Sequence, residues 1–188
     1  MLEPYFSYNH LSRYMQIFRF ILRLKHAAHL TARSWLMLSD YRKELWRRQH
    51  QGYEVGAETR LAALLDSTRH AISGFLSAFE SYFFLRVVTK QLRVMRSVVG
   101  DLNELEGHHL KMLESIIRAG FVGGSQGFAN KLVGLFRYVH DYFQVVKHLT
   151  LDDLPSFKWE ESEKKLQFLR TTFRSEHANI EKLIRRMG

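Results

Sequence analysis

The sequence contains no cysteine among its 188 residues. Disulfide bonds, zinc–thiolate sites, cysteine nucleophiles and iron–sulfur clusters are therefore excluded for this chain. A reducing compartment fits this composition. Hydrophobic residues make up 46% of the chain, enough to build a core, and we expect one helical domain over residues 1–188.

Proline is nearly absent, since only Pro4 and Pro155 occur. Helices can therefore continue between these positions until a glycine-rich or capped point, and patterns typical of strands are almost lacking. No run approaches about 18 uncharged apolar residues, and the N-terminus lacks a basic region followed by an apolar stretch. We expect neither secretion nor a membrane-spanning segment.

Glycines and capping residues divide the chain into about five predicted helices. Asp101 and Glu104 fit a capping box at the start of the third helix, after the turn that Gly100 permits. The pattern predicts an all-α fold, an elongated helical bundle whose first two helices are very long and antiparallel. The predicted helices span residues 8–50, 56–99, 101–118, 128–149 and 155–187.

Apolar residues recur at helical spacing along both long helices, which predicts that each buries one face. In the second helix the expected core stripe is Leu61, Leu65, Thr68, Ile72, Phe75, Phe79 and Tyr82, resuming as Leu85, Val88, Leu92, Met95 and Val99. In the first helix the expected core face is Leu11, Tyr14, Phe18, Ile21, Leu22 and Ala28, widened by Ile17, Phe20, Leu24 and Ala27. The narrow polar side is then Ser12, Arg13, Gln16, Arg19, Arg23 and His26.

Positive charge is concentrated near the N-terminus. The chain has a formal charge of +9, and residues 1–50 hold nine Lys and Arg against three Asp and Glu. A basic surface favours acidic partners, but charge alone does not choose among nucleic acid, anionic lipid and acidic protein.

Two short motifs could in principle bind a ligand. The glycine-rich residues 120–127 precede a predicted helix, where free amides favour anions, but they lack the Gly-Lys-Ser/Thr ending of a P-loop, so a helix connection is the preferred interpretation. Glu106 and His109 have the Glu-x-x-His spacing of di-iron bundles, but no second copy occurs. We therefore interpret His109 as a structural histidine and expect no metal and no cofactor.

No residue is nominated for catalysis. The serines lack a nucleophile elbow, and the pairs His26/His29 and His140/His148 lack the context of a zinc protease. We expect a protein that is not an enzyme.

Lys25 falls on the expected apolar face of the first helix. A buried ammonium group needs a partner or must reach water. Glu80, at the edge of the second helix's stripe, is the nearest plausible partner. A buried Lys25–Glu80 pair that fixes helix register is the structural interpretation.

The aromatic content combined with the basic residues raises an alternative, a basic helical protein that binds nucleic acid. Most aromatic residues fall on the expected core stripes, however, and the basic residues are not interleaved with exposed rings. Core packing explains the aromatic residues better, and nucleic acid is not the expected partner.

Three motifs resemble the γ-tubulin complex component family. Residues 14–25 read YMQIFRFILRLK, residues 69–82 read RHAISGFLSAFESY, and residues 101–113 read DLNELEGHHLKML. Each is similar to a family stretch, in the same order and at similar spacing, and the likeness is weakest after about residue 125. Leu92, Ile72 and Glu80 depart from the Trp, Met and Gln that are common in the family, which indicates a divergent member.

The resemblance implies a non-catalytic module that binds γ-tubulin and contributes to microtubule nucleation at a centrosome or spindle pole body, in the cytoplasm. Family members are longer, so contacts to other γ-tubulin complex components would involve parts outside this sequence. The residues expected to face γ-tubulin are Arg13, Arg19, Arg23, His26, Tyr53 and Phe121, and the structural residues are Lys25, Glu80, Asp101 and His109.

Overall fold

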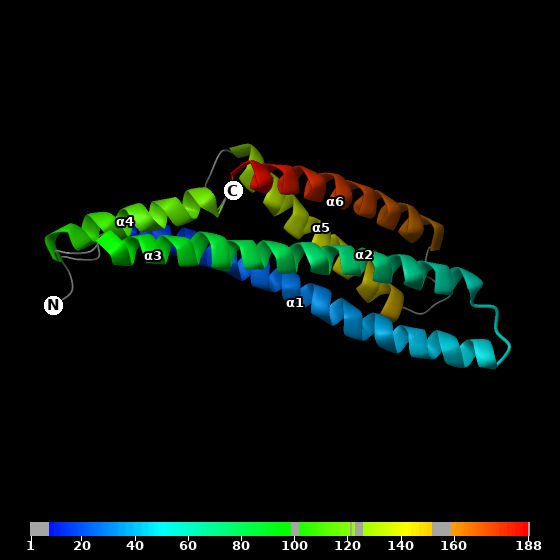
Figure 1. Ribbon diagram of the computed structural model, residues 1–188. Helices are drawn as coiled ribbons and strands as arrows, with labels where there is room; N and C mark the ends of the chain where they lie inside the picture. Colours follow the sequence, from blue (N-terminus) through cyan, green and yellow to red (C-terminus); the bar gives the residue numbers. More distant parts are fainter. Residues whose placement is uncertain (1–7, 99–101, 121, 123–125, 152–158, 188) are drawn as a thin grey trace. The chain divides into compact units, whose positions relative to one another are not determined.

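The computed structural model describes residues 8–98, 102–120, 122, 126–151 and 159–187 (Figure 1). These residues contain helices and no strand, which confirms the predicted all-α class. The helices are α1 (Tyr8–His50), α2 (Gly56–Ser81), α3 (Thr89–Val98), α4 (Leu102–Ala119), α5 (Gln126–Leu151) and α6 (Trp159–Met187), with a π-helical segment η1 (Tyr82–Val88) between α2 and α3. The bounds predicted for α1 agree with the structure at both ends.

The chain divides into two compact units. Unit 1 comprises residues 1–25 and 77–133, and unit 2 comprises residues 26–76 and 134–188. The single-domain expectation stays a prediction, and each unit is described by itself below.

Unit 1 packs the beginning of α1 against the end of α2, η1 and α4. The Phe20 ring of α1 lies 6.0 Å from the ring centroid of Phe79 and 5.2 Å from that of Phe83. Tyr82 donates a hydrogen bond to the carbonyl oxygen of Ala119, at 3.0 Å, and so connects η1 to the end of α4. The core of unit 1 is aromatic and aliphatic: Ile17, Phe20, Leu24, Phe79, Phe83, Val87, Met112, Leu113, Ile116 and Leu132.

Unit 2 packs the remainder of α1 and α2 with α5 and α6. Arg42 pairs with Asp66, and Arg48 with Glu58, so the two segments of α1 and α2 are antiparallel within this unit. The Phe75 ring of α2 meets the Phe173 ring of α6 edge to face, with centroids 5.8 Å apart. Between α1 and α2, Gly52 has a positive φ of 87°, a conformation that glycine adopts without a steric cost.

The second long helix differs from the prediction after Phe79. The first part of the expected stripe is buried, but Leu85 and Leu92 are exposed, and Phe83 and Val87 are buried instead. The reason is η1: the backbone N–H of Thr89 bonds to the carbonyl oxygen of Phe84, five residues back. This wider turn shifts the helical phase, so the inward positions continue at steps of four residues.

The expected core face of α1 is also wrong in unit 1. Leu11, Tyr14, Phe18 and Leu22 are exposed, whereas Ile17, Phe20 and Leu24 are buried. The helix has two apolar faces, and helical periodicity cannot tell which of them the neighbouring helices cover. The side chains that the sequence analysis used only to widen the face form the actual core contact.

The stretch Gly56–Ser97 has one 18-residue window that is long and apolar enough to cross a membrane. Core helices meet the same criterion. In this stretch Leu61, Leu65, Ile72, Phe75 and Phe83 are buried inside their own units. Packing accounts for these side chains, and 33% of the apolar window is buried.

Candidate functional site: the exposed faces of unit 1

The outer side of α1 in unit 1 carries an uninterrupted row of exposed apolar side chains. The row starts at Tyr8 and proceeds in steps of three, four, three and four residues. At 100° per residue these positions lie within about 80° of the helix circumference, and they are opposite the buried side chains of Ile17 and Leu24. We call this row the apolar seam: Tyr8, Leu11, Met15, Phe18 and Leu22.

Arg19 and Arg23 run along one flank of the apolar seam. Both side chains are exposed, and neither makes an ion pair with any residue that the structure describes. The sequence supplies no Asp or Glu between Glu3 and Asp40, so this part of α1 has no acidic side chain of its own. Their guanidinium groups are therefore available to an acidic partner.

Other predicted partner-facing residues have different surroundings. Arg13 lies 3.5 Å from Glu114 of α4, so its charge is engaged inside unit 1. In unit 2, His26 is exposed, and Tyr53 is exposed with the guanidinium carbon of Arg48 5.9 Å from its ring centroid. Phe121 lies outside the described residues.

The structure brings Lys25 and Glu80 together as an ion pair within unit 1. The expected burial is wrong, because the two side chains are 54% and 32% exposed. Lys25 Nζ also lies 5.8 Å from the ring centroid of Phe84. The ammonium group reaches water along the edge of the bundle, as long amphipathic side chains often do.

His109 of α4 forms a small polar cluster with α1. Its ring stacks on that of His10, with centroids 5.1 Å apart, and its Nε2 lies 2.8 Å from the hydroxyl oxygen of Tyr14. Burial, with a contribution from the charge of His10, lowers the pKa of His109. Because Tyr14 and His10 both come from α1, the cluster connects α1 to α4. The other predicted structural residue, Asp101, lies outside the described residues.

No group of three or more His, Asp or Glu side chains that could hold a metal occurs in the part of the chain that the structure describes. Glu106 contributes its backbone carbonyl oxygen, 3.4 Å from His10 Nε2, to the histidine cluster. Glu106 and His109 therefore take part in the packing of α4 against α1.

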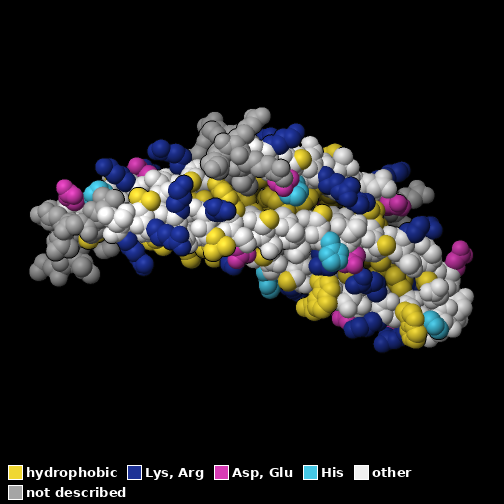
Figure 2. Space-filling model, viewed as in Figure 1, with side chains coloured by type: hydrophobic (Ala, Val, Ile, Leu, Met, Phe, Trp, Pro, Cys, Tyr) yellow, Lys and Arg dark blue, Asp and Glu magenta, His cyan; other side chains and the backbone are white. Residues whose placement is uncertain are grey.

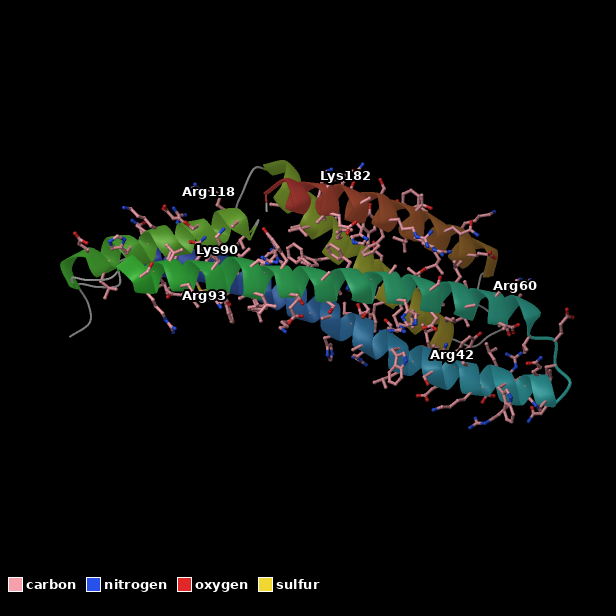
Figure 3. All side chains as sticks on the ribbon, viewed as in Figure 1. Arg42, Arg60, Lys90, Arg93, Arg118 and Lys182 are labelled. Carbon is pink, nitrogen blue, oxygen red and sulfur yellow. The ribbon has the colours of Figure 1, made fainter. Side chains whose placement is uncertain are left out.

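A second basic surface was missed by the sequence analysis. Four exposed cationic side chains occur on η1 and α3, and Figure 3 labels Lys90 and Arg93 of this group, with Arg118 on α4. None of the four forms an ion pair with a described residue. A signal was present, because no acidic residue occurs between Glu80 and Asp101. We call this group the α3 ridge: Arg86, Lys90, Arg93 and Arg96.

Figure 2 shows basic side chains distributed over the visible face, with hydrophobic side chains exposed between them. In unit 2 the exposed hydrophobic residues of α1 include Trp35, Leu36 and Trp46. Exposed large apolar side chains gathered in one area are typical of contact surfaces. The described faces therefore define an all-α protein that exposes both cationic and apolar side chains.

A family model for the gamma tubulin complex component C-terminal domain matches residues 1–187. The chain therefore belongs to the γ-tubulin complex component family, as its motifs indicated. Proteins of this family are cytoskeletal components of microtubule-organising centres. Searches of the curated proteins and of the solved structures gave no match.

Proposed function

We propose that this chain is a non-catalytic module that binds γ-tubulin and contributes to microtubule nucleation. The observation that supports the proposal is the family match over residues 1–187. A module of this kind would act in the cytoplasm at a microtubule-organising centre, such as a centrosome or spindle pole body. Other γ-tubulin complex components would bind next to this module in the assembled complex.

We assign Arg19 and Arg23, whose guanidinium groups are exposed, to this interaction. They are free of ion pairs among the described residues, so pairing with carboxylates of γ-tubulin would not require breaking an internal contact. Charges at the rim of an interface mainly set the association rate and the orientation of the partners. Binding through these residues should therefore weaken as salt is raised.

The test is recovery of purified γ-tubulin on the immobilised chain at low and physiological salt. The variant Arg19→Glu/Arg23→Glu should reduce recovery while the circular dichroism spectrum stays helical. The matched control is Lys90→Glu/Arg93→Glu, which makes the same charge change on the α3 ridge of the same unit. Absence of γ-tubulin from the wild-type eluate would refute the function, and an equal loss with both variants would refute the assignment to Arg19 and Arg23.

A further inference from the structure

The apolar seam of unit 1 has the spacing of a coiled-coil contact. In such contacts apolar residues alternate at steps of three and four, and each inserts between four side chains of the facing helix. The seam follows this spacing over residues 8–22, which is about four helical turns. Leu11, Phe18 and Leu22 are each more than half exposed, so the residues of unit 1 that the structure describes leave the centre of the row open.

The charged residues on either side of the apolar seam indicate which charge a bound partner would carry. Arg19 and Arg23 line one side, and Lys25, whose ammonium group is already paired with Glu80, is on the other. No acidic residue occurs from residue 4 to residue 39. A helix with carboxylates beside its own apolar row would therefore gain charge pairs that this chain cannot supply.

The same absence argues against a second copy of this chain as the occupant. Two copies of α1 placed seam to seam would bring arginines near arginines or near uncharged residues, and the carboxylate of Glu80 beside the seam is already paired with Lys25. A membrane surface is also a weaker fit. Helices that lie in the membrane interface have a polar opposite face, whereas the opposite side of this helix is occupied by the core of unit 1.

We infer that the apolar seam is a docking site for an amphipathic helix of a partner protein, with heptad-spaced aliphatic residues and Glu or Asp along its flank. This site shares Arg19 and Arg23 with the proposed γ-tubulin interaction, but its test with a synthetic helix does not require γ-tubulin. The aliphatic residues of the partner would cover Leu11, Met15 and Phe18. Its carboxylates would lie beside Arg19 and Arg23 and fix the direction and register of the helix.

The experiment uses the full chain and a fluorescent synthetic helix of three heptads, with Ile and Leu at the core positions and Glu at both flanks. Repulsion between the Glu flanks keeps this probe from pairing with itself. A second probe carries Lys in place of every Glu. By fluorescence anisotropy the Glu probe should bind the wild-type chain, and the Lys probe should bind about tenfold more weakly or worse.

The seam variant is Leu11→Ser/Leu22→Ser, and the matched control is Leu36→Ser/Leu85→Ser, which makes the same change at two exposed leucines outside the seam. The seam variant should lose about tenfold or more in affinity for the Glu probe, because two apolar contacts are removed. The control should bind as the wild type does. If a seam variant folds poorly, the charge variants Arg19→Glu/Arg23→Glu and Lys90→Glu/Arg93→Glu decide the site, because only the first should weaken binding of the Glu probe.

Three results would overturn the inference in favour of another occupant. Sedimentation velocity showing a dimer that the seam variant abolishes would assign the seam to a second copy. Co-sedimentation with phosphatidylcholine–phosphatidylserine vesicles that depends on Leu11 and Leu22 would assign it to a membrane. Loss of γ-tubulin recovery in the seam variant but not in its control would place the seam within the γ-tubulin site. Failure of the Glu probe to bind, or equal binding of both probes, would remove the docking site altogether.

Discussion

Tyr142 donates its hydroxyl hydrogen to the backbone carbonyl oxygen of Leu65, with the two oxygens 3.1 Å apart in the core of unit 2. Both side chains are almost completely buried. The bond connects α5 to α2, and burial raises the pKa of Tyr142, so the phenol stays protonated and able to donate. Tyr41 in the same unit provides the contrast, because its buried hydroxyl has no hydrogen-bond partner among the described residues.

The two tyrosines predict opposite responses to the same substitution. Tyr142→Phe should lower the free energy of unfolding by about 1 kcal/mol, because a satisfied buried hydrogen bond is lost. Tyr41→Phe should leave stability unchanged or raise it, because an unsatisfied buried hydroxyl is removed. Urea denaturation followed by circular dichroism measures the free energy of unfolding of both variants. A larger loss of stability in Tyr41→Phe than in Tyr142→Phe would contradict the view that only the Tyr142 hydroxyl is hydrogen-bonded.

Two glycines at α4 predict a second contrast. A Cβ at Gly120 would lie 2.5 Å from the Phe83 ring and 2.7 Å from the carbonyl oxygen of Ile116, so Gly120→Ala should destabilise by about 1–3 kcal/mol. Gly107 is a helical position where an added Cβ would meet nothing within 4 Å, so Gly107→Ala should stabilise by about 0.5–1 kcal/mol. Thermal melts of the two variants should therefore shift in opposite directions.

Asp66 accepts hydrogen bonds from Arg42 and Arg69 in unit 2. Burial alone would raise its pKa, but the two arginines outweigh burial and lower it. Asp66→Asn should cost about 1–3 kcal/mol, because hydrogen bonds to a charged acceptor are lost. Asp40→Asn, at an exposed position where the carboxylate pairs with Lys43, should change stability by less than about 0.5 kcal/mol.

The lowered pKa of Asp66 also sets a pH dependence. The unfolded carboxyl has an ordinary pKa of 3.8, and the folded value is below it. The stabilisation is therefore complete above the unfolded pKa and is lost as pH falls through the folded pKa. Acid titration of the wild type and Asp66→Asn should show a smaller acid loss in the variant, and parallel curves would contradict this role.

His109 predicts a pH effect at milder acidity. Its folded pKa is below the ordinary value of 6.5, so the unfolded chain binds more protons as pH falls below that value. The contribution of His109 to stability is present at pH 7.5 and decreases as pH falls toward the folded pKa. His109→Gln should reduce the slope of unfolding free energy against pH between 7.5 and 5.5, and an unchanged slope would exclude His109 as its source.

The Lys25–Glu80 ion pair should contribute little despite its position between α1 and the end of α2. Both side chains are substantially exposed, and exposed pairs are worth about 0–1 kcal/mol. A double-mutant cycle with Lys25→Met and Glu80→Gln should give a coupling energy in that range. A coupling energy above about 2 kcal/mol would indicate a desolvated pair and contradict the exposure of these two side chains.

Much of the fold was predictable because its signals are local. The scarcity of proline allowed residues 8–50 to be predicted as one helix, and the spacing of Leu61, Leu65 and Ile72 identified the buried side of α2. These signals come from backbone preferences and helical periodicity, which each segment expresses without its neighbours.

The features that sequence reasoning missed depend on tertiary packing. Leu11 and Phe18 are as apolar as Ile17 and Phe20, and only the neighbouring helices decide which pair is covered. The candidate site was therefore predicted in part: Arg19 and Arg23 are exposed as expected, but the apolar row beside them was assigned to the core. The α3 ridge was missed because the charge distribution was considered only for residues 1–50, whereas Arg86 and Lys90 lie in a second stretch without acidic residues.

The π turn at η1 has a consequence for any attempt to compare or redesign this stretch. Because the wide turn offsets α3 against α2, no single heptad numbering describes both sides of it. A π turn contains one residue more than an α turn, so removing one residue from η1 would restore regular α-helical spacing through this stretch. Alignments and grafts should therefore treat Val88 as the point where the register is reset.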